Sequence, residues 1–307
     1  AHFTGDAGFV VTNQNYIHDC IIKNSIFDNY GFSYENKPGN RNAIIQNCNI
    51  INAQIGKSGF VCKCEMGAYI RDCHIYGDNT IYEQYLSDVT NKVIIKTNYT
   101  PNNKTVDSSL NEAQKPLEGY NLVTIGLVPN TTTVMTNYVA GFIEEQGGNI
   151  WNKGGIDGCS VTGKVYGTNA AGFGITTTSF VNNSYANVLL NGTGKSAGFA
   201  LTNSGRITNC HALGMVSGAT GYGFVDSNSG TISNSYTAIW KTTATSDNYY
   251  PFYGTKGTVS SCYALNINSS NVNEGVTSVS DTELRALTSV GTIVTQAAEG
   301  GTYGQYT

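Results

Sequence analysis

The pair Gly-Phe returns along this chain and constrains its fold more than any other feature. The pairs begin at Gly8, Gly31, Gly59, Gly141, Gly172, Gly198 and Gly223. Successive pairs lie 23, 28, 82, 31, 26 and 25 residues apart. All gaps but one fall within the spacing of about 20 to 50 residues that is typical of stacked structural repeats. The sequence therefore predicts a repeat architecture.

A second recurring position follows each Gly-Phe and consists of a turn-forming residue before Cys or Ser. The pairs are Asp19-Cys20, Asn47-Cys48, Asp72-Cys73, Gly158-Cys159, Asn183-Ser184, Asn209-Cys210 and Asn234-Ser235. From Cys210 to Val216 small and apolar residues alternate with others, which predicts a strand. Ile207 also looks buried, so the chain must bend before Cys210. Asn209 suits that corner, because Asx residues tolerate a left-handed backbone.

Three short strands and three corners in about 25 residues make one turn of a β-solenoid. We expect an all-β, parallel β-helix of about eight or nine such coils, with strands about 4.8 Å apart. Like residues then stack into columns. Stacked thiols point the same way and satisfy disulfide geometry poorly, so we expect the eight cysteines to be free.

Composition excludes several classes of protein. Charged residues make up 12% of the 307 residues, about half of the usual ~25%. The net charge of −4 offers no basic footprint for nucleic acid. The sequence has no apolar run of about 18 residues, so we expect no membrane insertion.

The coil that contains Gly223-Phe224-Val225 and Gly230-Thr231-Ile232-Ser233-Asn234-Ser235-Tyr236 resembles the GLUG-type repeat of bacterial surface proteins. The resemblance covers roughly residues 140–265 well and 7–76 more loosely. It implies a right-handed parallel β-helix on an extracellular or cell-surface protein, including adhesins. The repeat is a scaffold, so no catalytic residue carries over.

Four segments follow from the spacing. Residues 1–76 and 140–276 are expected to form coils. Residues 77–139 form an insertion, either a hairpin or subdomain or two degenerate coils with a long loop. Residues 277–307 hold a short helix and a tail. Ser280-Asp281-Thr282-Glu283 resembles a capping box, and we expect its helix to cover the exposed edge of the last coil.

Aromatic residues at the interruptions are the candidate ligand-binding residues, because exposed rings stack on sugars and partner proteins. They are Tyr82, Tyr85 and Tyr99 of the insertion, and Trp240, Tyr249 and Tyr250 near the last coil. Phe252 is expected instead in the core, with Pro251 in the place of Gly.

Enzyme chemistry has weak support. The acids that could form a catalytic pair are Glu144, Glu145 and Asp157, with Glu65, Asp72, Asp78 and Glu83 as a looser set. The thiols and imidazole of Cys62, Cys64, Cys73 and His74 have the composition of a metal site but not its spacing. We therefore expect no catalytic residue, no metal and no cofactor.

The leading hypothesis is a non-enzymatic, extracellular bacterial cell-surface module that adheres to a host glycan or surface protein. The alternative is a polysaccharide-active β-helix enzyme or a phage tail-type receptor-binding protein. A third hypothesis is a structural spacer in a larger surface protein. Because no polar cap precedes Gly8, we also expect further domains of a longer parent chain.

Overall fold

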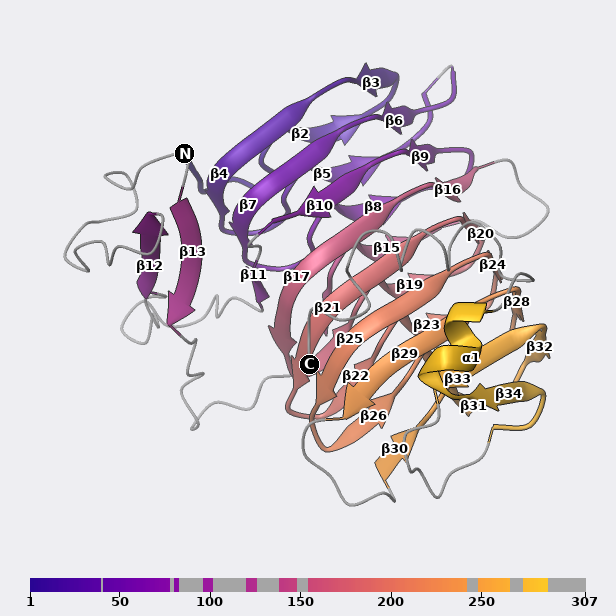
Figure 1. The fold of residues 1–307 in the computed structure, drawn as a ribbon. Coiled ribbons are helices and arrows are strands. Elements are labelled where there is room, and N and C mark those ends of the chain that lie inside the picture. Colours follow the sequence, from indigo (N-terminus) through magenta and orange to yellow (C-terminus); the bar gives the residue numbers. More distant parts are fainter. Residues whose placement is uncertain are drawn as a thin grey trace.

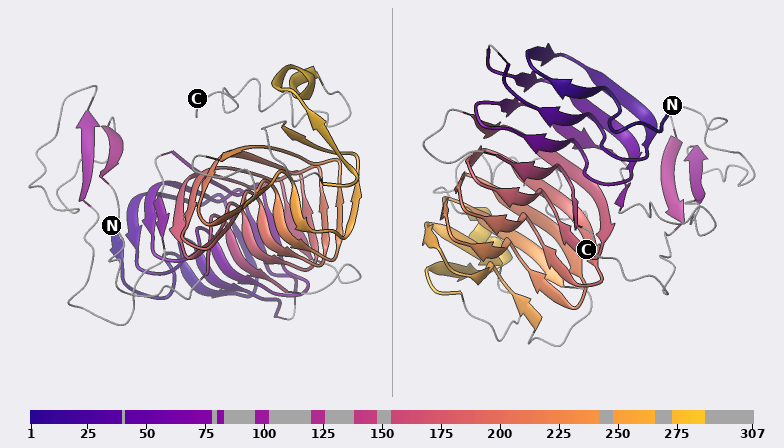
Figure 2. Two further views of the ribbon diagram at one scale, coloured as in Figure 1. Left: turned by 90° about the horizontal axis from the view of Figure 1, so that it is seen from below. Right: turned by 180° about the vertical axis from the view of Figure 1, so that it is seen from behind.

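The computed structural model describes residues 1–39, 41–77, 80–82, 96–101, 120–125, 138–147, 154–241, 248–265 and 273–286. It describes only the backbone at 80–82, 96–101, 120–125, 217, 240, 281, 285 and 286. The chain winds into a parallel β-solenoid (Figures 1 and 2), as predicted. Three sheets run along the stack of coils. Each coil passes through sheet 2, then sheet 3, then sheet 1.

Sheet 1 contains the longest strands. They are β1 (His2–Phe3), β4 (Ile21–Phe27), β7 (Asn49–Ile55), β10 (His74–Tyr76), β11 (Thr80–Tyr82), β17 (Ser160–Gly167), β21 (Tyr185–Gly192), β25 (His211–Ser217), β29 (Tyr236–Lys241), β33 (Cys262–Leu265) and β34 (Val276–Val279).

Sheets 2 and 3 have eight strands each, which agrees with the lower of the two predicted coil numbers. Sheet 2 comprises β2 (Val10–Asn13), β5 (Ser33–Asn36), β8 (Val61–Cys64), β15 (Ile143–Gln146), β19 (Gly174–Thr177), β23 (Ala200–Asn203), β27 (Val225–Asn228) and β31 (Tyr253–Thr255). Sheet 3 comprises β3 (Tyr16–His18), β6 (Ile44–Gln46), β9 (Tyr69–Arg71), β16 (Gly155–Asp157), β20 (Phe180–Asn182), β24 (Arg206–Thr208), β28 (Thr231–Ser233) and β32 (Thr258–Ser260).

A fourth, shorter sheet joins the end of sheet 1 to the next Gly-Phe. It comprises β14 (Tyr138–Ala140), β18 (Asn169–Ala171), β22 (Lys195–Ala197), β26 (Thr220–Tyr222) and β30 (Tyr249–Tyr250). The prediction of three strands per coil was therefore incomplete, because the residues before Gly-Phe also pair between coils.

The phenylalanines of the repeat form one continuous column in the core. From Phe9 to Phe252, neighbouring ring centroids lie 4.7 to 4.9 Å apart. Phe252 is fully buried, as predicted, and follows Pro251 where the other coils have Gly. The spacing of the rings matches the spacing of strands in a sheet, so each coil adds one ring to the column.

All eight cysteines are free, which confirms the prediction, and six of them form a second column that is buried except at Cys20, which is partly buried: Cys20, Cys48, Cys73, Cys159, Cys210 and Cys262. Each thiol in this column hydrogen-bonds a carbonyl two residues earlier. The Cys48 thiol donates to Gln46 O at 3.2 Å, and the Cys210 thiol donates to Thr208 O at 3.3 Å. The bond explains why Ser replaces Cys at this position: Ser184 donates to Asn182 O at 2.6 Å.

The corner before each thiol has the left-handed backbone that the sequence predicted. Its φ angle is 55° at Asp19, 50° at Asn47, 53° at Asn209 and 48° at Asn234. A β-carbon is strained in this region by roughly 1 to 2 kcal/mol, and Asx residues tolerate it better than others do. The recurring Asx therefore turns the chain from sheet 3 into sheet 1.

Asn209→Ala is expected to lower the free energy of unfolding by about 1 to 2 kcal/mol, because alanine has no side chain that favours the left-handed region. Asn209→Gly is expected to cost less, since glycine adopts this region freely. Both variants lose the hydrogen bond from Asn209 Nδ2 to Asn183 Oδ1, so their difference in urea unfolding isolates the backbone effect. An equal loss of unfolding free energy in the two variants would contradict the conclusion that Asn209 is favoured for its left-handed backbone.

The 77–139 segment interrupts the sequence but not the stack. The β10 strand pairs with β7 on one side and with β17 on the other, and β8 pairs directly with β15. The coils before and after the insertion are therefore neighbours. Within the insertion, β12 (Lys96–Pro101) and β13 (Tyr120–Ile125) pair antiparallel with each other and belong to none of the four sheets.

A helix forms at α1 (Asp281–Ala286), and its capping box is present. Ser280 N donates to Glu283 Oε2 at 2.7 Å, and Glu283 N donates to Ser280 Oγ at 3.2 Å. The helix lies on the outer side of the stack (Figure 2), and its Leu284 is fully buried in an apolar cluster with residues of sheet 1. The edge of β33, which the helix was expected to cover, is instead covered by β34.

Candidate binding face

The outer side of the first three strands of sheet 3 carries a group of exposed polar and aromatic side chains. The in-register pairing aligns Tyr16, Ile44 and Tyr69 in one column and His18, Gln46 and Arg71 in a second. The corner that follows each of these strands adds a third column, which consists of Asp19, Asn47 and Asp72. The N-terminal polar face is defined by Tyr16, His18, Asp19, Gln46, Asn47, Tyr69, Arg71 and Asp72.

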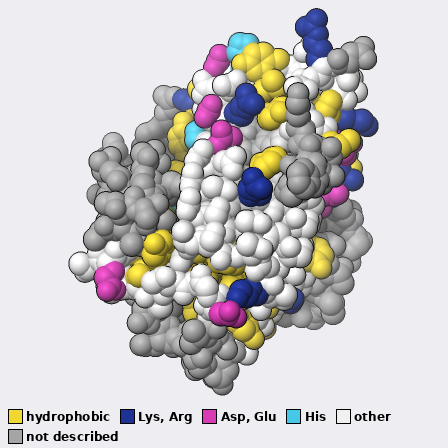
Figure 3. Space-filling view, turned by 90° about the vertical axis from the view of Figure 1, so that its right-hand side faces the viewer, with side chains coloured by type: hydrophobic (Ala, Val, Ile, Leu, Met, Phe, Trp, Pro, Cys, Tyr) yellow, Lys and Arg dark blue, Asp and Glu magenta, His cyan; other side chains and the backbone are white. Residues whose placement is uncertain are grey.

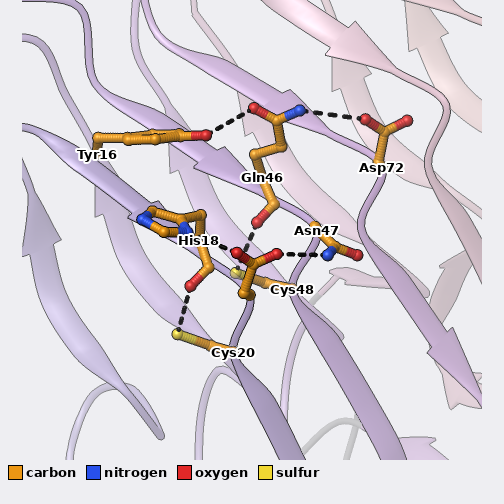
Figure 4. A network of polar contacts seen from close by, with 8 residues as sticks. Tyr16, His18, Cys20, Gln46, Asn47, Cys48 and Asp72 are labelled. Atoms are coloured by element: carbon orange, nitrogen blue, oxygen red, sulfur yellow. Dashed lines mark hydrogen bonds and ion pairs between the residues drawn. The ribbon is translucent and has the colours of Figure 1, made fainter.

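Hydrogen bonds connect this face across three coils (Figure 4). The Tyr16 hydroxyl donates to Gln46 Oε1 at 3.0 Å. Gln46 Nε2 in turn donates to Asp72 Oδ2 at 3.5 Å. Each bond runs from one coil to the next, because equivalent residues lie one strand spacing apart. The side chains are thereby held in place before any ligand arrives.

Asp19 receives two further contacts on the same face. His18 Nδ1 lies 2.7 Å from Asp19 Oδ2, and Asn47 Nδ2 donates to Asp19 Oδ1. The hydrogen bonds from His18 and then from Asn47 favour the carboxylate and lower the pKa of Asp19 below its ordinary value. Asp19 is therefore a fixed, ionised hydrogen-bond acceptor.

Aromatic rings lie among these polar groups. Tyr16 is 50% exposed, and its ring stacks on that of His18 with centroids 4.7 Å apart. The guanidinium carbon of Arg71 lies 4.5 Å from the centroid of the Tyr69 ring. Stacking of this kind restricts the rotamers of long side chains, so less entropy is lost when they bind a ligand.

The same three columns continue along sheet 3 with different chemistry. The second column proceeds from Arg71 through Asp157 and Asn182 to Thr208 and Ser233. Figure 3 shows this side of the molecule. Charged side chains and histidines gather toward its upper, N-terminal part, and a few further charged side chains lie lower down. The connected polar face thus lies on the first coils, and a separate pair further along sheet 3 places the guanidinium carbon of Arg206 5.5 Å from the centroid of the Phe180 ring.

Sequence reasoning missed this face, although a signal was present. The inward position Ile17, Ile45 and Ile70 was recognisable from the repeat, and its two neighbours in each strand must point outward. Those neighbours lie two and four residues before the ladder Cys: His18 and Tyr16 before Cys20, for example. Comparing the residues at these two outward positions from one coil to the next would have identified the residues of the polar face.

The aromatic residues predicted to bind ligands lie elsewhere. Tyr249 is only 3% exposed, packs in the core and donates its hydroxyl to Ile239 O at 3.0 Å, so its assignment to an exposed patch was wrong. Tyr250 is half-buried and stacks on Tyr222 with centroids 5.3 Å apart. Tyr222 is also the residue that pairs with Tyr250 in the fourth sheet, so the Tyr250 ring packs against the preceding coil.

For the other four candidates only the backbone or nothing is described. Tyr82 lies in β11 opposite Tyr166, Tyr99 lies in β12 opposite Leu122, and Trp240 lies in β29 opposite Met215. Tyr85 falls outside the described residues. Their role in ligand binding stays a prediction.

The structure does not gather Glu144, Glu145 and Asp157, the tighter group of carboxylates considered for catalysis, and Asp78 and Glu83 of the looser set fall outside the described residues. Glu144 and Glu145 lie in β15 of sheet 2, whereas Asp157 lies in β16 of sheet 3. Glu145 is paired with Lys63 at 3.8 Å, and Asp157 Oδ1 accepts a hydrogen bond from Asn183 Nδ2 at 2.8 Å. The acids belong to two different faces, each with its own partners.

Glu144 takes part in a local structural cluster. Tyr30 donates its hydroxyl to Glu144 Oε2 at 2.9 Å, and Cys62 Sγ lies 3.7 Å from the same oxygen. Burial raises the pKa of Cys62 to about 12, and burial also raises that of Tyr30. Both groups are therefore protonated donors at neutral pH, and the thiol is not an activated nucleophile.

The described residues contain no group of three or more His, Cys, Asp or Glu side chains that could hold a metal ion. They also contain no helix that is long and apolar enough to cross a membrane.

A buried aromatic column lies on the outer face of sheet 1. His211 is 3% exposed and stacked between Tyr185 and Tyr236, with ring centroids at 4.7 and 5.0 Å. Its Nδ1 has no hydrogen-bond partner in the part of the chain that the structure describes. Burial lowers the pKa of His211 to about 3, because the charged imidazolium would lose its hydration. The sequence indicated that His211 points away from the core but not that it is buried.

The stability of the protein is expected to fall as pH drops below about 6.5. There the unfolded His211 takes up a proton that the folded form refuses until about pH 3, which costs about 1.4 kcal/mol per pH unit. Burial also lowers the pKa of His74, which adds in the same direction. Urea unfolding between pH 7 and 5 should show a smaller pH dependence in His211→Phe than in the wild type. Tyr185→Phe is the control. If the free energy of unfolding of His211→Phe changed with pH as steeply as that of the wild type, His211 would not be the source of the pH dependence.

Comparisons with known protein families, with curated proteins and with solved structures each found no match for this chain.

Proposed function

We propose that the chain is a non-enzymatic module of a bacterial cell-surface protein, located outside the cell, that binds a glycan or a host surface protein. The resemblance of its coils to the GLUG-type repeat supports the location and the adhesive role. The separate placement of the carboxylates supports a binding role over a catalytic one. The solenoid supplies a rigid scaffold on which a surface can be repeated from coil to coil.

The observation that carries this proposal is the connected set of exposed groups on the N-terminal polar face. Its amide, carboxylate, imidazole and guanidinium groups are planar donors and acceptors that suit hydroxyl-rich ligands. Tyr16 adds an exposed ring beside them. Because these groups already bond to one another between coils, a ligand orders few side chains on binding.

A glycan array followed by calorimetry tests the proposal. The double variant Tyr16→Ala, Gln46→Ala is expected to lower affinity at least about tenfold, since it removes a ring and a central hydrogen-bonding group. Thr208→Ala, Ser233→Ala is the matched control, because both residues lie in the column of Gln46 several coils further on. Circular dichroism and thermal unfolding verify that each variant keeps the fold.

The insertion requires its own arm, since Tyr82, Tyr85 and Tyr99 are predicted to bind a ligand there. A variant with Tyr82→Ala and with residues 83–137 replaced by a short Gly-Ser linker removes all three side chains and separates the two surfaces. Binding that survives this deletion but not the Tyr16→Ala, Gln46→Ala change supports the polar face. Binding lost only with the deletion moves the site to the insertion. No binding by the intact protein to any glycan or host surface protein favours the spacer hypothesis.

A further inference from the structure

The two ends of the solenoid are closed to different degrees. At the C-terminal end, Asn273 Oδ1 accepts hydrogen bonds from Phe252 N at 2.7 Å and Tyr253 N at 3.0 Å. Asn273 Nδ2 donates to Tyr253 O at 2.7 Å. Three backbone groups at the start of the last strand of sheet 2 are thereby satisfied, and β34 pairs with β33 in sheet 1.

A buried column also ends in a charge at that end. Val165, Leu190 and Val216 occupy one inward position of sheet 1, and Lys241 occupies the same position in the next coil. Burial lowers the pKa of Lys241, which shows that the ammonium group is partly desolvated there. An inward-pointing charge discourages another strand from adding to the stack.

The N-terminal end differs in its apolar side chains. The strands β2 and β3 have a strand partner on one side only, as do β31 and β32 at the other end, so the outer edge of β2 and β3 offers backbone groups for pairing. Phe9 is 51% exposed, and the inward residues Ile17 and Ile22 are only half-buried, whereas their equivalents Phe32, Ile45 and Ile50 are fully buried. The Phe9 ring stacks on Phe32 with one face only. The apolar core is therefore partly exposed to solvent at this end of the solenoid.

The shape of this end limits what can cover it. Strand β1 already lies in the next layer, where His2 pairs with Ile26 and Phe3 with Phe27. The Phe3 ring stacks on that of Phe27 with centroids 5.1 Å apart. A second copy brought end to end would meet this projecting strand first. A chain that runs parallel in the layer of β1 would instead meet the open edges of β2, β3 and the first part of β4.

We propose that the N-terminal end is a docking surface for one further parallel coil of the same repeat, lying in the layer of β1. Such a coil would place an aromatic ring over Phe9 and apolar side chains over Ile17 and Ile22. It would continue a coil-to-coil interface that the protein already repeats along its length. Addition of a strand to an open edge gives affinity through backbone hydrogen bonds and specificity through alternate side chains.

The structure supplies a coil in the correct register. His2 and Gln54 both pair with Ile26, so Ala1 stands where Ala53 stands in the coil of β7. A second copy of residues 31–52 fused before Ala1 therefore continues directly into β1. The matched control is the same fusion with Phe32→Asp, Ile45→Asp and Ile50→Asp in the added copy only.

The fusion with the native copy is expected to raise the thermal midpoint by several degrees and to slow hydrogen exchange at the amides of β2 and β3. The control fusion is expected to do neither. If the fusion does not fold, the peptide 31–52 added in trans to the wild-type chain is expected to protect the same amides. Equal exchange with native and control copies, or with native and control peptides, would overturn the proposal. So would a wild-type dimer in light scattering that Phe9→Lys dissociates, since the occupant would then be a second copy.

Discussion

Gly172→Ala is expected to destabilise the protein by more than about 4 kcal/mol, which is outside the range of ordinary point mutations. A β-carbon at this position would lie 1.9 Å from Gly198 O and 3.1 Å from Ala186 Cβ. The first contact is with the backbone of the next coil, so no rotamer change relieves it. The two coils would have to separate, and with them the hydrogen bonds of sheet 2 that begin at Phe173.

The measurement is urea unfolding, with soluble yield as a second readout. Gly5→Ala is the control, because a β-carbon there would meet no atom within 4 Å. That control should stay within about 0.5 kcal/mol of the wild type. A Gly172→Ala protein with nearly wild-type stability would show that the coils are less tightly apposed than the structure has them.

Phe173→Ala is expected to lower the free energy of unfolding by about 3 to 5 kcal/mol, the usual cost of truncating a buried phenylalanine. The ring is fully buried and is stacked between Phe142 and Phe199, at 4.8 and 4.7 Å. Its removal leaves a gap in a column whose neighbours are held by their own coils, so collapse cannot fill the gap.

Phe9→Ala is the matched control for that variant. Phe9 occupies the same column but is 51% exposed and stacks on one neighbour only. Phe9→Ala should lower the free energy of unfolding by less than half as much as Phe173→Ala in the same urea titration. Equal losses at the two positions would mean that the stability of the column does not come from burial.

Much of the fold could be predicted because it follows from local sterics repeated many times. The Asx corners, the small residue before each Phe and the alternation after each Cys all reflect backbone angles or strand periodicity. The candidate face was harder to predict. His18, Gln46 and Arg71 share no residue type, so no repeat in the sequence marks them. Their relation appears only when strand pairing aligns them in one column.

The sequence by itself therefore determined the winding of this protein, namely the coil period, the ring and thiol columns and the corner angles. Those features need only neighbours within one coil or an identical residue in the next. Tertiary structure alone decided which segments meet across a long separation: β8 with β15 past the insertion, and Leu284 with the outer face of sheet 1. It also decided the burial of Tyr249 and His211 and the gathering of the polar face. These depend on which side chains of other segments cover a residue, and alternation along one strand contains no information about that cover.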